Sequence, residues 1–173
     1  MIVDGRVFHY ARYLDWLVTT PLLLLDLGAL AGISTEDSVM LVFLDVLMVL
    51  AGLAGGLSKG PASFWMWILG CIFFLPIVYD LAFTFRTKAK VVGVAASACY
   101  DKLAVLTVLL WTAYPVVFYL SEYAGTLSTT AEIGTYMVLD VAAKCVFGAI
   151  LLSSHKSLEH ESLGYSTPGD VMN

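Results

Sequence analysis

Charged residues are scarce in this chain. Only 13% of its 173 residues are charged and 60% are hydrophobic, with a mean hydropathy of +0.86. An ordinary soluble domain is about 25% charged. This scarcity excludes that class and indicates an integral membrane protein, with the lipid bilayer as its surroundings. The nine basic residues, against fourteen acidic ones, form no basic patch, so nucleic acid is not an expected partner.

Cysteine is equally rare. Cys71, Cys99 and Cys145 lie in or beside apolar segments and have no metal-ligand spacing. We therefore predict no metal site and expect all three to be buried small residues. A cleavable signal peptide is not expected at the N-terminus, because charged residues interrupt it before an apolar core forms.

What the chain does have is long apolar runs. Five segments are long enough to cross a bilayer, which takes about 20 helical residues. Turn-forming stretches such as GGLSKGP separate them. We predict an all-α membrane bundle in residues 1–155, followed by a tail at 156–173. The predicted helices lie near 10–31, 36–57, 62–85, 100–124 and 130–153.

Basic residues predict the direction of these spans. The break after the third span carries Arg86, Lys88, Lys90 and Lys102, and positively charged loops stay on the cytoplasmic side. Two further crossings bring the C-terminal tail back to that side. Because five is odd, the sequence predicts a multi-pass protein of the cell membrane with its N-terminus outside and its C-terminus in the cytoplasm.

Within the first span, the run DWLVTTPLLLLD at residues 15–26 begins and ends with aspartate. Ionisable residues inside a membrane are costly and usually functional. Asp15 and Asp26 are separated by about three helical turns, roughly 16 Å of rise. Arg12 and Thr19 fall on the same stripe of the helix. This spacing predicts one carboxylate in each half of the membrane, both facing the same seam.

The fifth span contains a second ordered pair. Asp140 and Lys144 are one turn apart in MVLDVAAKC. A structural ion pair would explain them, but a lysine in mid-span is rare, and lysine forms Schiff bases with aldehydes. A protonated imine needs carboxylates beside it, and Asp140 and Asp15 are the candidates. Asp45 and Asp80, taken singly, fit polar contacts between helices as well as they fit a function.

Three stretches together resemble a known family. ARYLDWLVTTPLLLLDL, LLWTAYPVVFYLSEYAG and MVLDVAAKCVFGAILL are similar to the third, sixth and seventh helices of microbial rhodopsins. The similarity runs to about residue 155 and is closest to bacteriorhodopsin-like proton pumps, including algal and fungal ones. The resemblance implies a seven-helix fold of which the first two helices are absent here. The chain would then be a fragment, a partial gene product or half of a split protein, and a separate chain or segment with those helices would be a partner.

The resemblance also implies a role for each ionisable residue. Lys144 would carry all-trans retinal as a protonated Schiff base. Asp15 would be the proton acceptor and counterion, Asp26 the cytoplasmic proton donor, and Asp140 the second counterion. We expect the buried carboxyl of Asp26 to hold its proton in the dark, because its leucine neighbours disfavour the charged form. Protons would leave through an outer group, with Thr19 on the same stripe as the acceptor. The residues of that outer group are Arg12, Glu122 and Glu132.

The retinal pocket is predicted from the same resemblance. Phe118 stands where many family members have tryptophan, and Leu23 falls at a position that tunes colour. The residues expected around the retinal are Trp16, Thr20, Met48, Gly52, Trp67, Thr107, Trp111, Tyr114, Pro115 and Phe118.

These roles predict a light-driven outward proton pump, a transporter and not an enzyme. A light sensor on the same fold is the first alternative, and Asp26 argues against it. A chloride pump would lack the acceptor carboxylate, so Asp15 argues against that, and a channel is a further alternative. The last is a truncated product without pumping activity. Assembly into a homo-oligomer is left open.

Overall fold

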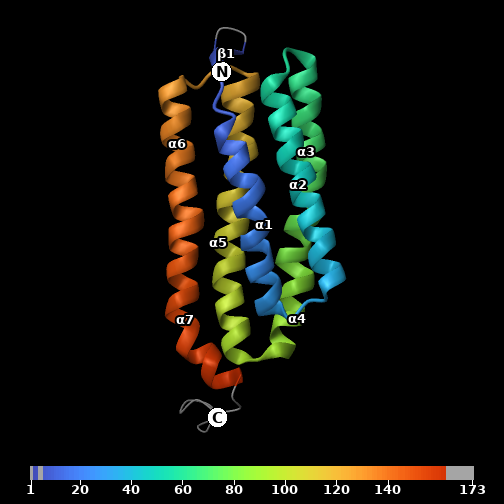
Figure 1. The fold of residues 1–173 in the computed structure, drawn as a ribbon, viewed down its shortest axis with the longest axis vertical. Helices are drawn as coiled ribbons and strands as arrows, with labels where there is room; N and C mark the ends of the chain where they lie inside the picture. The colour runs from blue at the N-terminus through green and yellow to red at the C-terminus, as the bar shows by residue number, and fades with distance from the viewer. Residues whose placement is uncertain (1, 4–5, 163–173) are drawn as a thin grey trace.

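The chain folds into a bundle of five long helices (Figure 1), and the computed structural model describes residues 2–3 and 6–162. Three of the long helices contain a π-helical segment, labelled η. A short antiparallel hairpin, β1 (Ile2–Val3) and β2 (Arg6–Val7), precedes them. The helical elements in order are α1 (Ala11–Ala31), α2 (Thr35–Leu57), α3 (Pro61–Tyr79), η1 (Asp80–Thr84), α4 (Phe85–Val92), α5 (Val94–Phe118), η2 (Tyr119–Tyr123), α6 (Thr129–Val141), η3 (Ala142–Val146) and α7 (Phe147–Ser162).

The prediction of five apolar membrane-spanning helices is confirmed, but the last three are longer than predicted. The third continues through η1 and α4 to Val92, and the next begins at Val94. The basic stretch RTKAKVV is therefore helix and not loop, which suits its good helix-forming residues. The fifth helix continues to Ser162. Residues 156–162 of the predicted tail are thus helical, and 163–173 lie outside the described residues.

Glycine, serine and proline residues mark where the helices begin and end. Gly32 adopts a left-handed conformation, with φ of 60°, and ends α1. The Ser34 and Ser128 hydroxyls accept backbone N–H groups at the starts of α2 and α6. Pro61 occupies the first turn of α3, where no N–H is needed. These short connections keep successive helices antiparallel and side by side.

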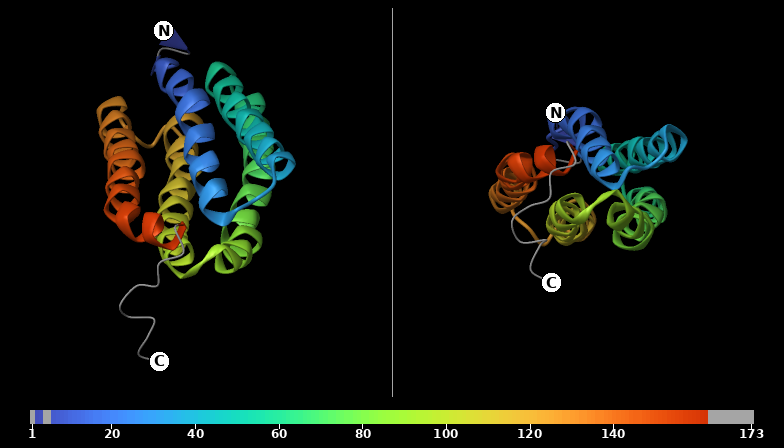
Figure 2. Two further views of the ribbon diagram at one scale, coloured as in Figure 1. Left: turned by 60° about the horizontal axis from the view of Figure 1, so that its bottom comes forward. Right: turned by 90° about the horizontal axis from the view of Figure 1, so that it is seen from below.

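The helices form a ring that is seen best along the bundle axis (Figure 2). Around the ring stand α1, α2, α3–α4, α5 and α6–α7. The β1–β2 hairpin lies at one end of the bundle and the end of α7 at the other. We call the end near the N-terminus the upper end, as drawn in Figure 1. One buried apolar cluster lies toward the lower end and includes Leu27, Ile77 and Leu103. A second contains Tyr13 and Trp16.

The cysteines differ from the prediction in one case. Cys99 is buried and Cys71 is half-buried, but Cys145 is exposed. Cys145 follows Lys144 directly, so it points to the outer side of the fifth helix when the lysine points toward α1. The prediction that all three are buried is therefore wrong for Cys145, which lies on a surface suited to lipid.

Candidate functional site

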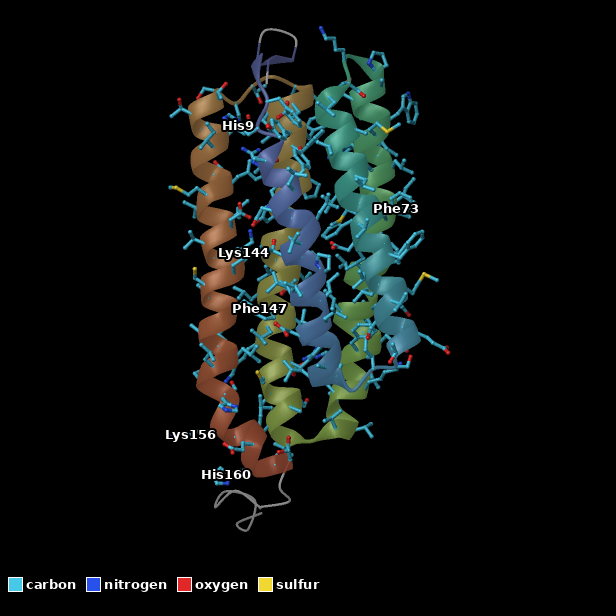
Figure 3. All side chains as sticks on the ribbon, in the orientation of Figure 1. His9, Phe73, Lys144, Phe147, Lys156 and His160 are labelled. Carbon is cyan, nitrogen blue, oxygen red and sulfur yellow. The ribbon has the colours of Figure 1, made fainter. Side chains whose placement is uncertain are left out.

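Lys144 lies between two carboxylates contributed by different helices. It belongs to η3, and Figure 3 shows it about midway along the bundle, on the side of the fifth helix that faces α1. Its Nζ donates to Asp15 Oδ2 on α1 and lies 3.5 Å from Asp140 Oδ1 on α6. One ammonium thus faces two carboxylates, and the sequence-predicted trio is brought together.

Asp140 is held by two further donors. Trp16 Nε1–H donates to its Oδ1 at 3.0 Å, and the Tyr114 hydroxyl donates to the same oxygen at 2.9 Å. The two rings meet edge to face, with centroids 5.1 Å apart and planes at 83°. These donors stabilise negative charge on Asp140 and fix its side chain. Within the described part of the chain, no neutral donor contacts the Asp15 carboxylate, and its side chain is 48% exposed.

A second ion pair lies nearer the upper end. Arg12 donates to Glu132 Oε1 at 2.7 Å, and the Glu132 side chain is only 1% exposed. The Arg12 guanidinium also lies 3.9 Å from the centroid of the Tyr136 ring, a cation–π contact. Glu122 is half-buried in η2 at the same end. The predicted outer group therefore clusters at one end of α1 and α6.

An apolar cavity lies beside Lys144. Its volume is about 110 Å³, and part of it is open to the outside. Its walls are mainly aromatic and aliphatic, and among the described residues that line it Lys144 is the only basic one. The chemistry of this lining suits an apolar aldehyde, whose carbonyl carbon would lie at the amine. The predicted pocket residues that line it are Trp16, Thr20, Met48, Gly52, Trp67, Trp111, Tyr114, Pro115 and Phe118.

Thr107 and Thr19 are not in the cavity wall. Thr107 is buried in α5, 2% exposed, outside the lining. Thr19 Oγ1 donates back to the carbonyl oxygen of Asp15 at 2.9 Å, so it contacts the backbone of the carboxylate residue and not its side chain. Leu23, predicted to tune colour, does line the cavity.

Asp26 differs from the expectation of a dry carboxyl. Its side chain is on the exposed side of α1, together with Leu22 and Leu25, while Leu24 and Leu27 are buried. Leucines flank Asp26 on every side of the helix, but no helix of the described chain covers the side on which it lies. Burial of this carboxyl by the chain itself was therefore a wrong expectation.

The sequence analysis did not predict one polar contact between helices and one aromatic residue of the site. Thr20 Oγ1 donates to Asp45 Oδ2 at 2.7 Å, and Asp45 is fully buried. No spacing could have paired residues on two different helices. Tyr136 could have been found, because Glu132, Tyr136, Asp140 and Lys144 recur every four residues and so form one stripe of a helix.

The chain is similar to known proteins in both sequence and fold. The family model described as bacteriorhodopsin-like protein matches residues 1–158. Archaerhodopsin-1 from Halorubrum ezzemoulense is 43% identical over 152 residues, which are 87% of this chain and 58% of that protein. The solved light-driven proton pump LR (Mac) from Leptosphaeria maculans is 40% identical with a TM-score of 0.84, and the match covers 88% of this chain and 62% of that one.

A bromide-bound form of halorhodopsin from Halobacterium salinarum is also similar, at 32% identity and a TM-score of 0.78, covering 83% of this chain and 60% of that one. The chain thus spans about three fifths of the length of these relatives. The matched region nevertheless includes every residue of the site described above. The chain belongs to the bacteriorhodopsin-like family of microbial rhodopsins.

Proposed function

We propose that this chain is the retinal-binding part of a light-driven outward proton pump, with retinal attached to Lys144. One observation carries the proposal: the Lys144 amine faces an apolar cavity on one side and two carboxylates on the other. A lysine in mid-membrane is unfavourable unless it is paired or used. Attachment of an apolar aldehyde at Nζ would account for both the cavity and the amine.

The residues present suit retinal. The aromatic walls contributed by Trp67, Trp111 and Tyr114 would hold a flat polyene, and the cavity excludes other charged groups from its apolar end. When bound covalently at Lys144 Nζ, retinal supplies absorption of visible light and a photoisomerisation that changes the direction and proton affinity of the Nζ–H group.

Asp15 is the better acceptor for the proton on Lys144 Nζ. Its Oδ2 is in direct contact with Nζ and makes no other side-chain bond within residues 6–162. Asp140 Oδ1 is already committed to the Trp16 and Tyr114 donors. Asp140 therefore keeps a fixed negative charge, while Asp15 can take up a proton and release it.

Release of protons would use the ion pair above Asp15. A proton arriving on Asp15 would remove a negative charge about one turn from Arg12 on α1, so Arg12 would interact more strongly with the Glu132 carboxylate. A proton bound in the outer group of Arg12, Glu122 and Glu132 would then be released toward the upper end. We assign the upper end to the outside, because the basic residues Lys88 and Lys90 lie in α4 at the lower end.

Asp26 would return a proton to Lys144 Nζ from the lower half of the membrane.

The exposure of Asp26 and Asp15 indicates which partners the chain needs. Two carboxylates on an open membrane-facing side are costly against lipid. We therefore propose that further transmembrane helices, from another segment or chain, cover this side of α1 in the working protein.

The experiment is a light-driven pH change. The full chain is placed in vesicles with all-trans retinal, with and without a segment that carries two such helices. We expect illumination to move protons only where a visible band forms, and Asp15→Asn to abolish the movement. Asp80→Asn is the matched control, since Asp80 is half-buried in η1 outside the cavity wall.

Three outcomes would contradict the pump. A visible band with no proton movement in either preparation would favour the sensor, and movement of chloride in place of protons would favour a halide pump. Absence of any visible band in both would favour a product with no pumping activity.

A further inference from the structure

Trp67 makes a hydrogen bond that its place in the cavity wall does not require. Its indole Nε1–H donates to the carbonyl oxygen of Pro115 on α5 at 2.9 Å. The ring also packs against Phe64 and Tyr119, with centroids 5.8 and 5.2 Å away. The indole is therefore held on several sides while it contacts the Pro115 peptide.

Pro115 removes one regular hydrogen bond from α5. Proline has no N–H, so the carbonyl of Trp111 one turn earlier loses its helical partner. The π-helical segment η2 begins at Tyr119 and widens the next turn. The Pro115 carbonyl oxygen also accepts the backbone N–H of Tyr119, so Trp67 is a second donor, from α3, to a carbonyl between the proline and the π-helical segment.

Tyr114 connects this peptide to the site. It directly precedes Pro115, and its hydroxyl donates to Asp140 Oδ1 at 2.9 Å. Hydrogen bonds weaken steeply as their geometry departs from linearity. A small displacement of the Pro115 peptide therefore changes how well Tyr114 reaches Asp140.

We propose that Trp67 is a positioning residue that acts on Asp140 through the Pro115 peptide and Tyr114. The contacts run from α3 to α5 and on to α6. The inference rests on the proposed function only for the role of Asp140 beside Lys144.

The surroundings of Asp140 give the direction of the effect. The charged groups that face it are Lys144, 3.5 Å away, and Asp15, which binds the same ammonium. The neutral donors are Trp16 and Tyr114. Because the vibration of a carboxylate depends on the hydrogen bonds it accepts, a weaker bond from Tyr114 should shift the infrared band of Asp140 toward its position in Tyr114→Phe, where that bond is absent.

The test is the infrared frequency of the Asp140 carboxylate band at fixed pH, identified as the band that is lost in Asp140→Asn. It is recorded on the full chain with and without retinal. Trp67→Phe keeps an aromatic ring and removes the N–H, and we expect it to shift the band in the same direction as Tyr114→Phe does. Trp65→Phe is the control and should leave the band unchanged, because Trp65 is 63% exposed on the outer side of α3.

A double variant separates positioning from a general structural effect. In a Tyr114→Phe background, Trp67→Phe should produce no further shift, because the route to Asp140 is already cut. An undiminished shift there, or a band in Trp67→Phe at the same frequency as in Trp65→Phe, would overturn the inference. If Trp67→Phe does not fold, benzothienylalanine at position 67 keeps the indole shape without the N–H and is judged by the same criteria. Failure of the proposed function would appear separately, as a missing retinal adduct on Lys144, and leaves the spectrum without retinal valid.

Discussion

Glu161 ties the end of the fifth helix to the start of α5, and removing its carboxylate should loosen both. Its Oε1 and Oε2 accept the backbone N–H groups of Ala95 and Ala96 at 2.9 and 3.0 Å. These N–H groups have no partner within the helix. We therefore predict that Glu161→Ala lowers the free energy of unfolding.

The size of this loss follows from the two contacts. Loss of a helix cap costs about 0.5–2 kcal/mol, and loss of a negative charge at a helix N-terminus costs a further 0.3–1 kcal/mol, approximately. We expect a total of about 2 kcal/mol, measured by reversible denaturant titration in mixed micelles. Glu159→Ala is the control, because Glu159 is exposed on the same helix, and it should change the value by less than about 0.5 kcal/mol.

Gly93 provides a second way to break the same contact. A Cβ at this position would lie 2.2–2.5 Å from the carboxyl atoms of Glu161, so Gly93→Ala should push the carboxylate away. The two losses should not add, since either change removes the same cap. Equal stability of Glu161→Ala and Glu159→Ala, or full additivity with Gly93→Ala, would refute the reasoning.

Three further predictions concern single side chains. Asp15→Asn removes the carboxylate in contact with Lys144 Nζ, so the visible band should shift to the red and proton movement should stop; unchanged colour and pumping would transfer the acceptor role to Asp140. Asp26→Asn should leave the colour intact but make the return of a proton to Lys144 Nζ proportional to the proton concentration and faster with added azide, as measured by flash photolysis at several pH values. A return as fast and as pH-independent as in the parent would make Asp26 only a polar residue. Tyr13→Phe should be neutral or stabilise the protein by about 1 kcal/mol in a denaturant titration, because the Tyr13 hydroxyl is buried with no hydrogen-bond partner among the described residues; a clear loss of stability would show that the hydroxyl has a partner.

The sequence predicted the elements and the central trio well, for physical reasons. Apolar runs of membrane length are hard to mistake, and the four-residue spacing of Asp140 and Lys144 puts both on one face of a helix. Contacts between helices could not be predicted from the sequence in the same way. The bond from Thr20 to Asp45 and the bond from Trp67 to Pro115 depend on how helices pack, which no spacing within one helix determines.

The errors have an equally physical origin. The stretch RTKAKVV was assigned to a loop because it is charged, although its residues favour helix and only Gly93 interrupts it. Asp26 was expected to be dry because leucines flank it in sequence. Whether a side of a helix is buried depends on its neighbours in space, and none of the described helices covers that side of α1.

Attachment of retinal to Lys144 is the central claim, and mass spectrometry tests it most directly. The full chain is incubated with all-trans retinal, reduced with borohydride and digested. We predict one added retinyl group, on the peptide that contains Lys144, and no visible band or adduct in Lys144→Ala. An adduct on another lysine, or a visible band that survives in Lys144→Ala, would contradict the account.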